Sequence, residues 1–61
     1  MKLRNEDLSL AARKALVARL LRTRFEAGAI AEYEYLILQG RIEQVATREA
    51  LDAIQAEVEG I

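Results

Sequence analysis

Large apolar residues recur every three or four positions in the first half of the chain, the spacing that places them on one face of an α-helix. At about 100° per residue they fall within an arc of about half the helix circumference. This pattern predicts an amphipathic helix over residues 6–27, with Asn5 as its N-cap and acidic residues in its first turn. The apolar face of this predicted helix consists of Leu10, Leu16, Val17, Leu20, Leu21 and Phe25.

Gly28 marks the end of this predicted helix. A glycine directly after a helix commonly adopts the left-handed conformation that closes the last turn. Only Ala29 and Ile30 separate it from the next helical pattern, and so short a connection makes consecutive helices antiparallel neighbours. We therefore expect an antiparallel helical hairpin with its turn at Gly28.

The second half of the chain carries apolar residues on two faces of a predicted helix. The Tyr33 stripe consists of Tyr33, Leu36 and Ile37, and in an unbroken helix it would be extended by Leu51, Ile54 and Val58. The Tyr35 stripe consists of Tyr35, Leu38, Ile42 and Val45, spaced three, four and three residues apart as in a heptad seam. A helix that buries two faces needs two neighbours. One is the helix of the first half, and the other is a second chain or the C-terminal segment folded back.

We expect the Tyr33 stripe to pack inside the chain and the Tyr35 stripe to contact a partner. The predicted partner interface is therefore Tyr35, Leu38, Ile42 and Val45. The predicted intrachain core combines the apolar face of the first helix with the Tyr33 stripe and its extension: Leu10, Leu16, Val17, Leu20, Leu21, Phe25, Tyr33, Leu36, Ile37, Leu51, Ile54 and Val58.

Residues 40–47 decide whether the second half is one helix or two. Gly40 costs about 1 kcal/mol relative to alanine inside a helix, but no proline and no cluster of turn residues marks a loop there. We expect one long helix over about 30–58, bent near 40–47. The alternative is a break in this region followed by a short third helix over 48–59, with Thr47 as its N-cap.

The composition narrows the possible chemistry. The chain has 61 residues and contains no cysteine, histidine, proline or tryptophan. It therefore lacks the usual zinc ligands, a thiolate nucleophile and the commonest general acid or base near neutral pH. Its paired carboxylates, Glu32 with Glu34 and Glu57 with Glu59, are two residues apart and do not share a helical face. We expect a single domain over 1–61 that is not an enzyme and has no catalytic residue, metal or cofactor.

Charge divides the chain into two parts. Residues 1–25 hold seven basic and two acidic side chains, whereas residues 26–61 hold two basic and eight acidic ones. We interpret this as a basic helix packed beside an acidic one, with steering of an oppositely charged partner as the alternative. Arg13 and Arg24 fall within the apolar face of the first helix. They snorkel there to solvent or, in the alternative interpretation, anchor carboxylates of a partner.

The pattern does not favour a membrane or a nucleic acid as partner. No uncharged segment approaches the roughly 20 residues of a membrane span. Polar residues follow the first four positions, where a signal peptide would have its apolar region, so we expect a cytoplasmic protein. The second helix begins with acidic residues that would face the phosphates if it read DNA. The least favoured alternative is a nucleic-acid-binding dimer that uses Arg13, Lys14, Arg19 and Arg22.

Two resemblances centre on the predicted turn, which carries Arg22, Phe25, Gly28, Ala29, Glu32, Tyr33 and Leu36. Over about residues 10–54, this pattern resembles the small two-helix co-chaperones of type III secretion needle subunits. The resemblance implies an α-hairpin that binds a tetratricopeptide-like chaperone and helps to keep the needle subunit unpolymerised. Residues 24–36 are also similar to a stretch in the long helices of outer-membrane efflux channels. We interpret this second match as convergent helix–turn composition or as a fragment, because such channels need a secretion signal and barrel strands that the pattern does not provide.

The expected fold is all-α, an antiparallel helical hairpin that completes a helical bundle with another chain. A chain this small buries only about 60% of its unfolded surface, and association supplies further burial. The expected function is that of a protein–protein interaction module, a small helical adaptor or co-chaperone that buries an apolar helix face against a partner chain. The alternative is a self-associating structural homodimer, natural or engineered, that forms a four-helix bundle.

Overall fold

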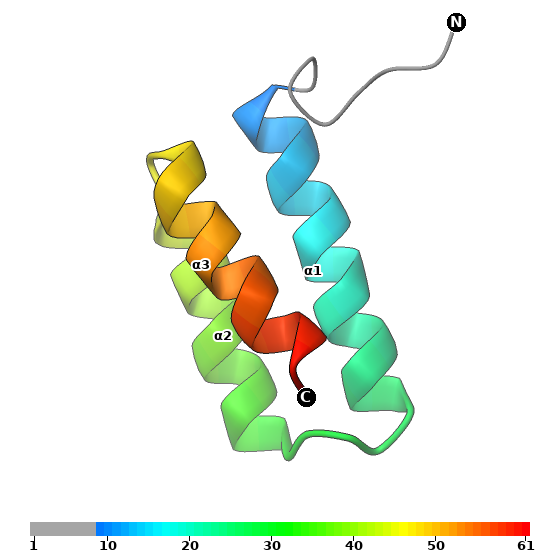
Figure 1. Ribbon diagram of the computed structural model, residues 1–61. Coiled ribbons are helices and arrows are strands. Elements are labelled where there is room, and N and C mark those ends of the chain that lie inside the picture. Colours follow the sequence, from blue (N-terminus) through cyan, green and yellow to red (C-terminus); the bar gives the residue numbers. More distant parts are fainter. Residues whose placement is uncertain (1–8) are drawn as a thin grey trace, which may run out of the picture.

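Three α-helices follow one another in the computed structural model, which describes residues 9–61. α1 spans Leu10–Glu26, α2 spans Glu32–Gln44 and α3 spans Arg48–Glu59. α1 and α2 run antiparallel, and α3 folds back to pack against both of them (Figure 1). The expected all-α class is therefore confirmed, whereas the expected hairpin of two long helices is only partly matched.

Ser9 begins α1 from an extended backbone conformation. Its hydroxyl oxygen accepts a hydrogen bond from the Ala12 N–H at 3.1 Å, which satisfies one of the free donors of the first turn. The expected N-cap, Asn5, lies outside the described residues. Within them, the first helical residue is Leu10.

Gly28 closes α1 as the sequence predicts. Its φ of 80° lies in the left-handed region, which residues with a Cβ enter only at a cost. The N–H groups of Gly28 and Ala29 donate to the carbonyl oxygens of Phe25 and Arg24, each at 3.0 Å. This pair of hydrogen bonds forms a Schellman motif. The expected turn at Gly28 is confirmed, and it starts the antiparallel hairpin.

A break at residues 45–47 divides the second half of the chain, so the prediction of one long helix over 30–58 is wrong and the three-helix alternative is confirmed. Val45 follows α2 in an extended conformation, with φ −64° and ψ 132°. Thr47 then caps α3, because its hydroxyl oxygen accepts a hydrogen bond from the Ala50 N–H at 3.2 Å.

Lys14 of α1 supplies hydrogen bonds at this break. Its Nζ donates to the carbonyl oxygens of Glu43, at 2.9 Å, and Val45, at 3.1 Å. In a continuous helix, backbone N–H groups four residues further on would bond to these oxygens. The ammonium group therefore replaces hydrogen bonds that the break removes, and it places a positive charge at the negative end of α2. Gly40, in contrast, remains within α2.

The hydrophobic core lies between the three helices. Eight apolar side chains that are at most 8% exposed form it: Val17, Leu21, Ile30, Leu38, Ile42, Leu51, Ile54 and Val58. Half-buried apolar side chains pack around them, namely Leu10, Ala18, Leu20, Phe25, Tyr35 and Val45. Among these, the Phe25 and Tyr35 rings stack with centroids 4.4 Å apart and an interplanar angle of 11°. Ile30, in the connection between α1 and α2, also belongs to the core, which the helical pattern did not predict because Ile30 lies outside both helices.

The two apolar stripes of α2 have exchanged their expected places. Leu38 and Ile42 of the Tyr35 stripe, predicted to meet a partner, are buried in the chain's own core, and Tyr35 and Val45 pack against it. The Tyr33 stripe, predicted to be core, is exposed. The break explains the exchange. In an unbroken helix Leu51, Ile54 and Val58 would have extended the Tyr33 stripe, but the reversal of the chain turns them onto the face of α2 that also contacts α1.

Leu16 is the other residue of the predicted core that the structure exposes, at 50%. The rest of the prediction for α1 and α3 agrees with the structure. Val17, Leu21, Leu51, Ile54 and Val58 are buried, and Leu10, Leu20 and Phe25 pack against the buried cluster.

Candidate partner-binding surface

The Tyr33 stripe gives α2 an exposed apolar face. Tyr33 is 65% exposed, Leu36 54% and Ile37 59%. Residues separated by three and four positions project from the same face of a helix, so the three side chains form one strip along α2. Isolated apolar residues on a surface are ordinary, whereas apolar side chains gathered on one face indicate a contact surface.

Gly40 continues the same face, seven residues after Tyr33 and two turns further along α2. A Cβ built at this position would meet no atom within 4 Å outside the local helix. The packing of the chain itself therefore does not require a glycine here, although the glycine costs α2 about 1 kcal/mol relative to alanine. Without a side chain at Gly40, another backbone can approach the stripe closely.

Carboxylates flank the Tyr33 stripe on both sides. At about 100° per residue, Glu34 falls on one side of it and Glu32 and Glu43 fall on the other. We call these three residues the acidic rim. None of their carboxylates makes a hydrogen bond or an ion pair within the part of the chain that the structure describes, and the hydrogen bond from Lys14 reaches only the backbone carbonyl of Glu43. The stripe is thus bordered by uncompensated negative charge.

Arg41 lies on the same side of α2 as Glu34, but its charge is already paired. Its two terminal nitrogens donate to the two carboxylate oxygens of Glu57 on α3, at 3.0 and 2.7 Å. This bidentate hydrogen bond is the main cause that lowers the pKa of Glu57 and raises the pKa of Arg41. Arg41 therefore joins α2 to α3 and leaves the acidic rim uncompensated.

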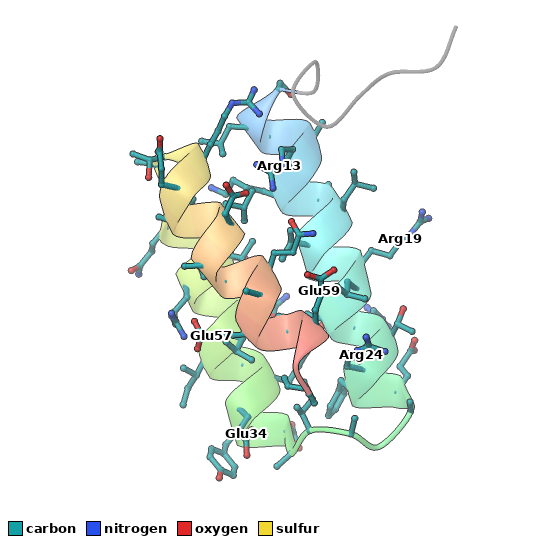
Figure 2. All side chains as sticks on the ribbon, viewed as in Figure 1. Arg13, Arg19, Arg24, Glu34, Glu57 and Glu59 are labelled. Carbon is teal, nitrogen blue, oxygen red and sulfur yellow. The ribbon has the colours of Figure 1, made fainter. Side chains whose placement is uncertain are left out.

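The exposed apolar surface continues from α2 to the end of α3. An open depression of about 400 Å³ is lined by Glu34, Ile37, Leu38, Glu57 and Ile61. Glu34 on α2 and Glu57 on α3 lie along the same edge of the molecule (Figure 2). Ile61, 41% exposed, adds an apolar group from the C-terminal end of the chain to the lining of this depression. A side chain that crosses the Tyr33 stripe can enter there.

Arg13 shows that the opposite charges of the two parts of the chain meet within the molecule. Its Nη2 donates to Asp52 Oδ1 at 2.6 Å and to Gln55 Oε1 at 3.0 Å, and both acceptors are on α3. The Arg13 side chain is only 12% exposed. The interpretation of a basic helix packed beside an acidic segment thus holds for this contact, and Arg13 is not available to anchor a partner's carboxylate.

The remaining cations of α1 differ in their surroundings. Lys14 bonds to the end of α2, as described, and Arg22 Nε lies 3.6 Å from Glu26. Arg19 extends from α1 away from the other helices (Figure 2). Arg24 is half-buried, and its Nε is buried without a hydrogen-bond partner within residues 9–61. Within residues 9–61, Arg13, Lys14 and Arg22 of α1 thus already have partners in the chain itself.

The carboxylates of the described chain do not gather into a cluster. Within residues 9–61 no group of three or more histidine, cysteine, aspartate or glutamate residues is placed to hold a metal ion. The paired carboxylates of the sequence do not form an acid–base pair, because Glu57 binds Arg41 and Glu59 lies exposed on α3. A membrane span needs about 20 consecutive apolar residues, and none of the three described helices provides one.

The sequence pattern did not predict this surface, because the Tyr33 stripe was expected to lie in the core. The signals were nevertheless present in the sequence: a mid-helix glycine in register with three large apolar residues, and glutamates on either side of them. Comparisons of the chain with protein-family models, with curated proteins and with solved structures find no match. The resemblances around the turn therefore stay predictions.

Proposed function

We propose that this chain is a small, non-enzymatic helical adaptor or co-chaperone that binds a helix of another protein along the Tyr33 stripe of α2. The observation that carries the proposal is the exposure of Tyr33, Leu36 and Ile37 on one face of a helix whose opposite face is buried. A helix from a partner can lie along such a strip and cover it with its own apolar face.

The size of the stripe sets the expected affinity. Full burial of a large apolar side chain is worth roughly 1.5–3 kcal/mol, and the three side chains of the stripe are already partly covered. Loss of translational and rotational freedom opposes binding. A contact of this size falls at the low end of protein interfaces, so we expect a dissociation constant on the order of 10⁻⁶–10⁻⁴ M. That range suits an adaptor that binds and releases its client.

The test uses a synthetic amphipathic peptide of about 20 residues, long enough to be helical in water, with a leucine stripe flanked by glutamine. We expect fluorescence anisotropy of the labelled peptide to show saturable binding to the chain. The double variant Leu36→Gln, Ile37→Gln should lose at least about tenfold in affinity, because it removes two of the apolar contacts. It should keep its helical circular dichroism, since both side chains are exposed.

Leu16→Gln is the matched control. Leu16 is also an exposed leucine, but it lies on α1 beside α3, where it lines a small depression with Arg13 and Gln55. This variant should bind the peptide as the original chain does. Equal losses for both variants would contradict the assignment of the surface. Sedimentation of the chain alone tests the alternative: a dimer that the α2 double variant dissociates would replace the adaptor by a homodimer.

A further inference from the structure

We infer that the helix bound by the Tyr33 stripe belongs to a different chain and carries lysine or arginine residues on both sides of its apolar face. This inference rests on the proposed function and specifies the chemistry of the partner. It follows from the acidic rim, from the pairing of Arg41 and from the position of Gly40.

The acidic rim places negative charge where the flanks of a docked helix would lie. Glu32 and Glu34 are in the first turn of α2, where a negative charge also stabilises the helix through its dipole. Glu43 is near the C-terminal end of α2, where the same dipole disfavours an acid. The dipole of α2 therefore does not account for Glu43, whereas a cationic flank on a bound helix would.

A second copy of the chain does not fit this surface. If two Tyr33 stripes packed antiparallel, each flank would meet its own equivalent, and Glu32 and Glu43 would face the Glu43 and Glu32 of the other copy. If they packed parallel, the Glu34 flank would face the flank of Glu32 and Glu43. Arg41 could relieve neither arrangement, because both of its terminal nitrogens are bonded to Glu57. The phosphates of nucleic acids and anionic lipids are disfavoured for the same electrostatic reason.

Gly40 determines how closely the basic helix can approach. It lies within the stripe between Ile37 and the end of α2, and its Cβ direction is open. A large apolar side chain of the partner can rest on the bare backbone at this position. This brings the two helix axes together and shortens the distance between the acidic rim and the cations of the partner, which strengthens their attraction.

The experiment compares three labelled peptides with one leucine stripe and three different flanks: lysine, glutamine and glutamate. We expect the lysine-flanked peptide to bind about tenfold or more tightly than the glutamine-flanked one, and the glutamate-flanked peptide to bind most weakly. The preference should shrink between about 50 mM and 500 mM salt, because exposed charges are screened. If the three peptides bind equally, the inference is wrong and the adaptor function stands. If none of them binds, the proposed function itself fails.

Two double variants that remove the same number of charges test whether the acidic rim causes the preference for lysine-flanked peptides. Glu32→Gln with Glu43→Gln should reduce the preference for lysine flanks to within about threefold, while binding of the glutamine-flanked peptide stays unchanged. The control removes the same two charges elsewhere, with Glu49→Gln and Glu59→Gln on the exposed surface of α3. It should keep the full preference. An equal reduction in both double variants would show that net charge, rather than the acidic rim, attracts the peptide, and would overturn the inference.

Gly40→Leu tests the close approach separately. Leucine is a good helix former and its Cβ would enter open space, so the melting temperature of the variant should equal or exceed that of the original chain. Binding of the lysine-flanked peptide should nevertheless weaken at least about tenfold, because the new side chain holds the helices apart. Unchanged or tighter binding would show that the surface needs only apolar area, and the role of Gly40 would be rejected.

Discussion

The two apolar stripes of α2 are alike in composition and opposite in exposure. Each combines a tyrosine with aliphatic residues at helical spacing, yet the Tyr35 stripe is buried or half-buried and every large side chain of the Tyr33 stripe is more than half exposed. The reversal of the chain at residues 45–47 makes the difference, because it places α3 on the same face of α2 that α1 contacts. The burial of a stripe therefore depends on the direction of the next helix rather than on the stripe itself.

Alanine substitution of one isoleucine from each stripe gives the largest expected difference in the free energy of unfolding. Ile42 is 3% exposed and Ile37 is 59% exposed on the same helix. Ile42→Ala should lower the free energy of unfolding by about 2–5 kcal/mol, because it removes buried methyl groups and leaves a cavity. Ile37→Ala should change it by less than about 0.5 kcal/mol. Urea unfolding followed by circular dichroism at low protein concentration measures both values.

The Ile37→Ala variant also checks for association in this experiment. If the isolated chain buried the Tyr33 stripe against a second copy, Ile37→Ala would destabilise it as well, and the loss would grow with protein concentration. Similar losses for the two variants at every concentration would break the comparison altogether, because they would place both faces of α2 inside the fold.

A smaller loss of stability is expected when Thr47 is substituted, because Thr47 caps α3 and so maintains the break. Thr47→Ala removes the hydroxyl that accepts the Ala50 N–H and should cost about 1 kcal/mol. Thr23→Ala is the matched control: its hydroxyl donates to the Arg19 carbonyl within α1, and alanine is the better helix former, so stability should stay within about 0.5 kcal/mol or rise. Thermal melts compare the two. An equal change in both would show that the Thr47 cap does not hold α3 in place.

Local signals in the sequence predicted the parts of the fold that neighbouring residues decide. Gly28 identified the first turn, because a left-handed residue with two short-range hydrogen bonds is specified within six residues. Thr47 identified the start of α3 as the alternative to a continuous helix. A cap of this kind competes with helix continuation by only about 1 kcal/mol, so the sequence pattern could not decide between the two outcomes.

The exposed and buried faces of α2 could not be predicted in the same way. Their assignment depends on contacts between residues far apart in the sequence, such as the hydrogen bonds of Lys14 to the end of α2 and of Arg13 to α3. Neither contact produces a periodic pattern in the sequence, because each depends on where a helix distant in the sequence packs. The candidate surface was missed for the same reason, although Gly40 and the acidic rim were visible as a pattern.

The weakest expected effect concerns the ion pair that lies between the two stripes and joins α2 to α3. The hydrogen bond from Arg41 lowers the pKa of Glu57 in the folded chain. This contribution to stability is therefore present above the pKa of an unfolded glutamate and is lost as the pH falls through the lower, folded pKa. Glu57→Gln should flatten the decline in urea stability between about pH 5 and pH 3, whereas Glu59→Gln, at a carboxylate with no ion pair in the described chain, should not.

Because Arg41 and Glu57 are both largely exposed, the loss of stability caused by Glu57→Gln should be smaller than that caused by Thr47→Ala and should shrink in about 1 M salt. A pH dependence that Glu57→Gln leaves unchanged would show that the tie between α2 and α3 rests on the core alone.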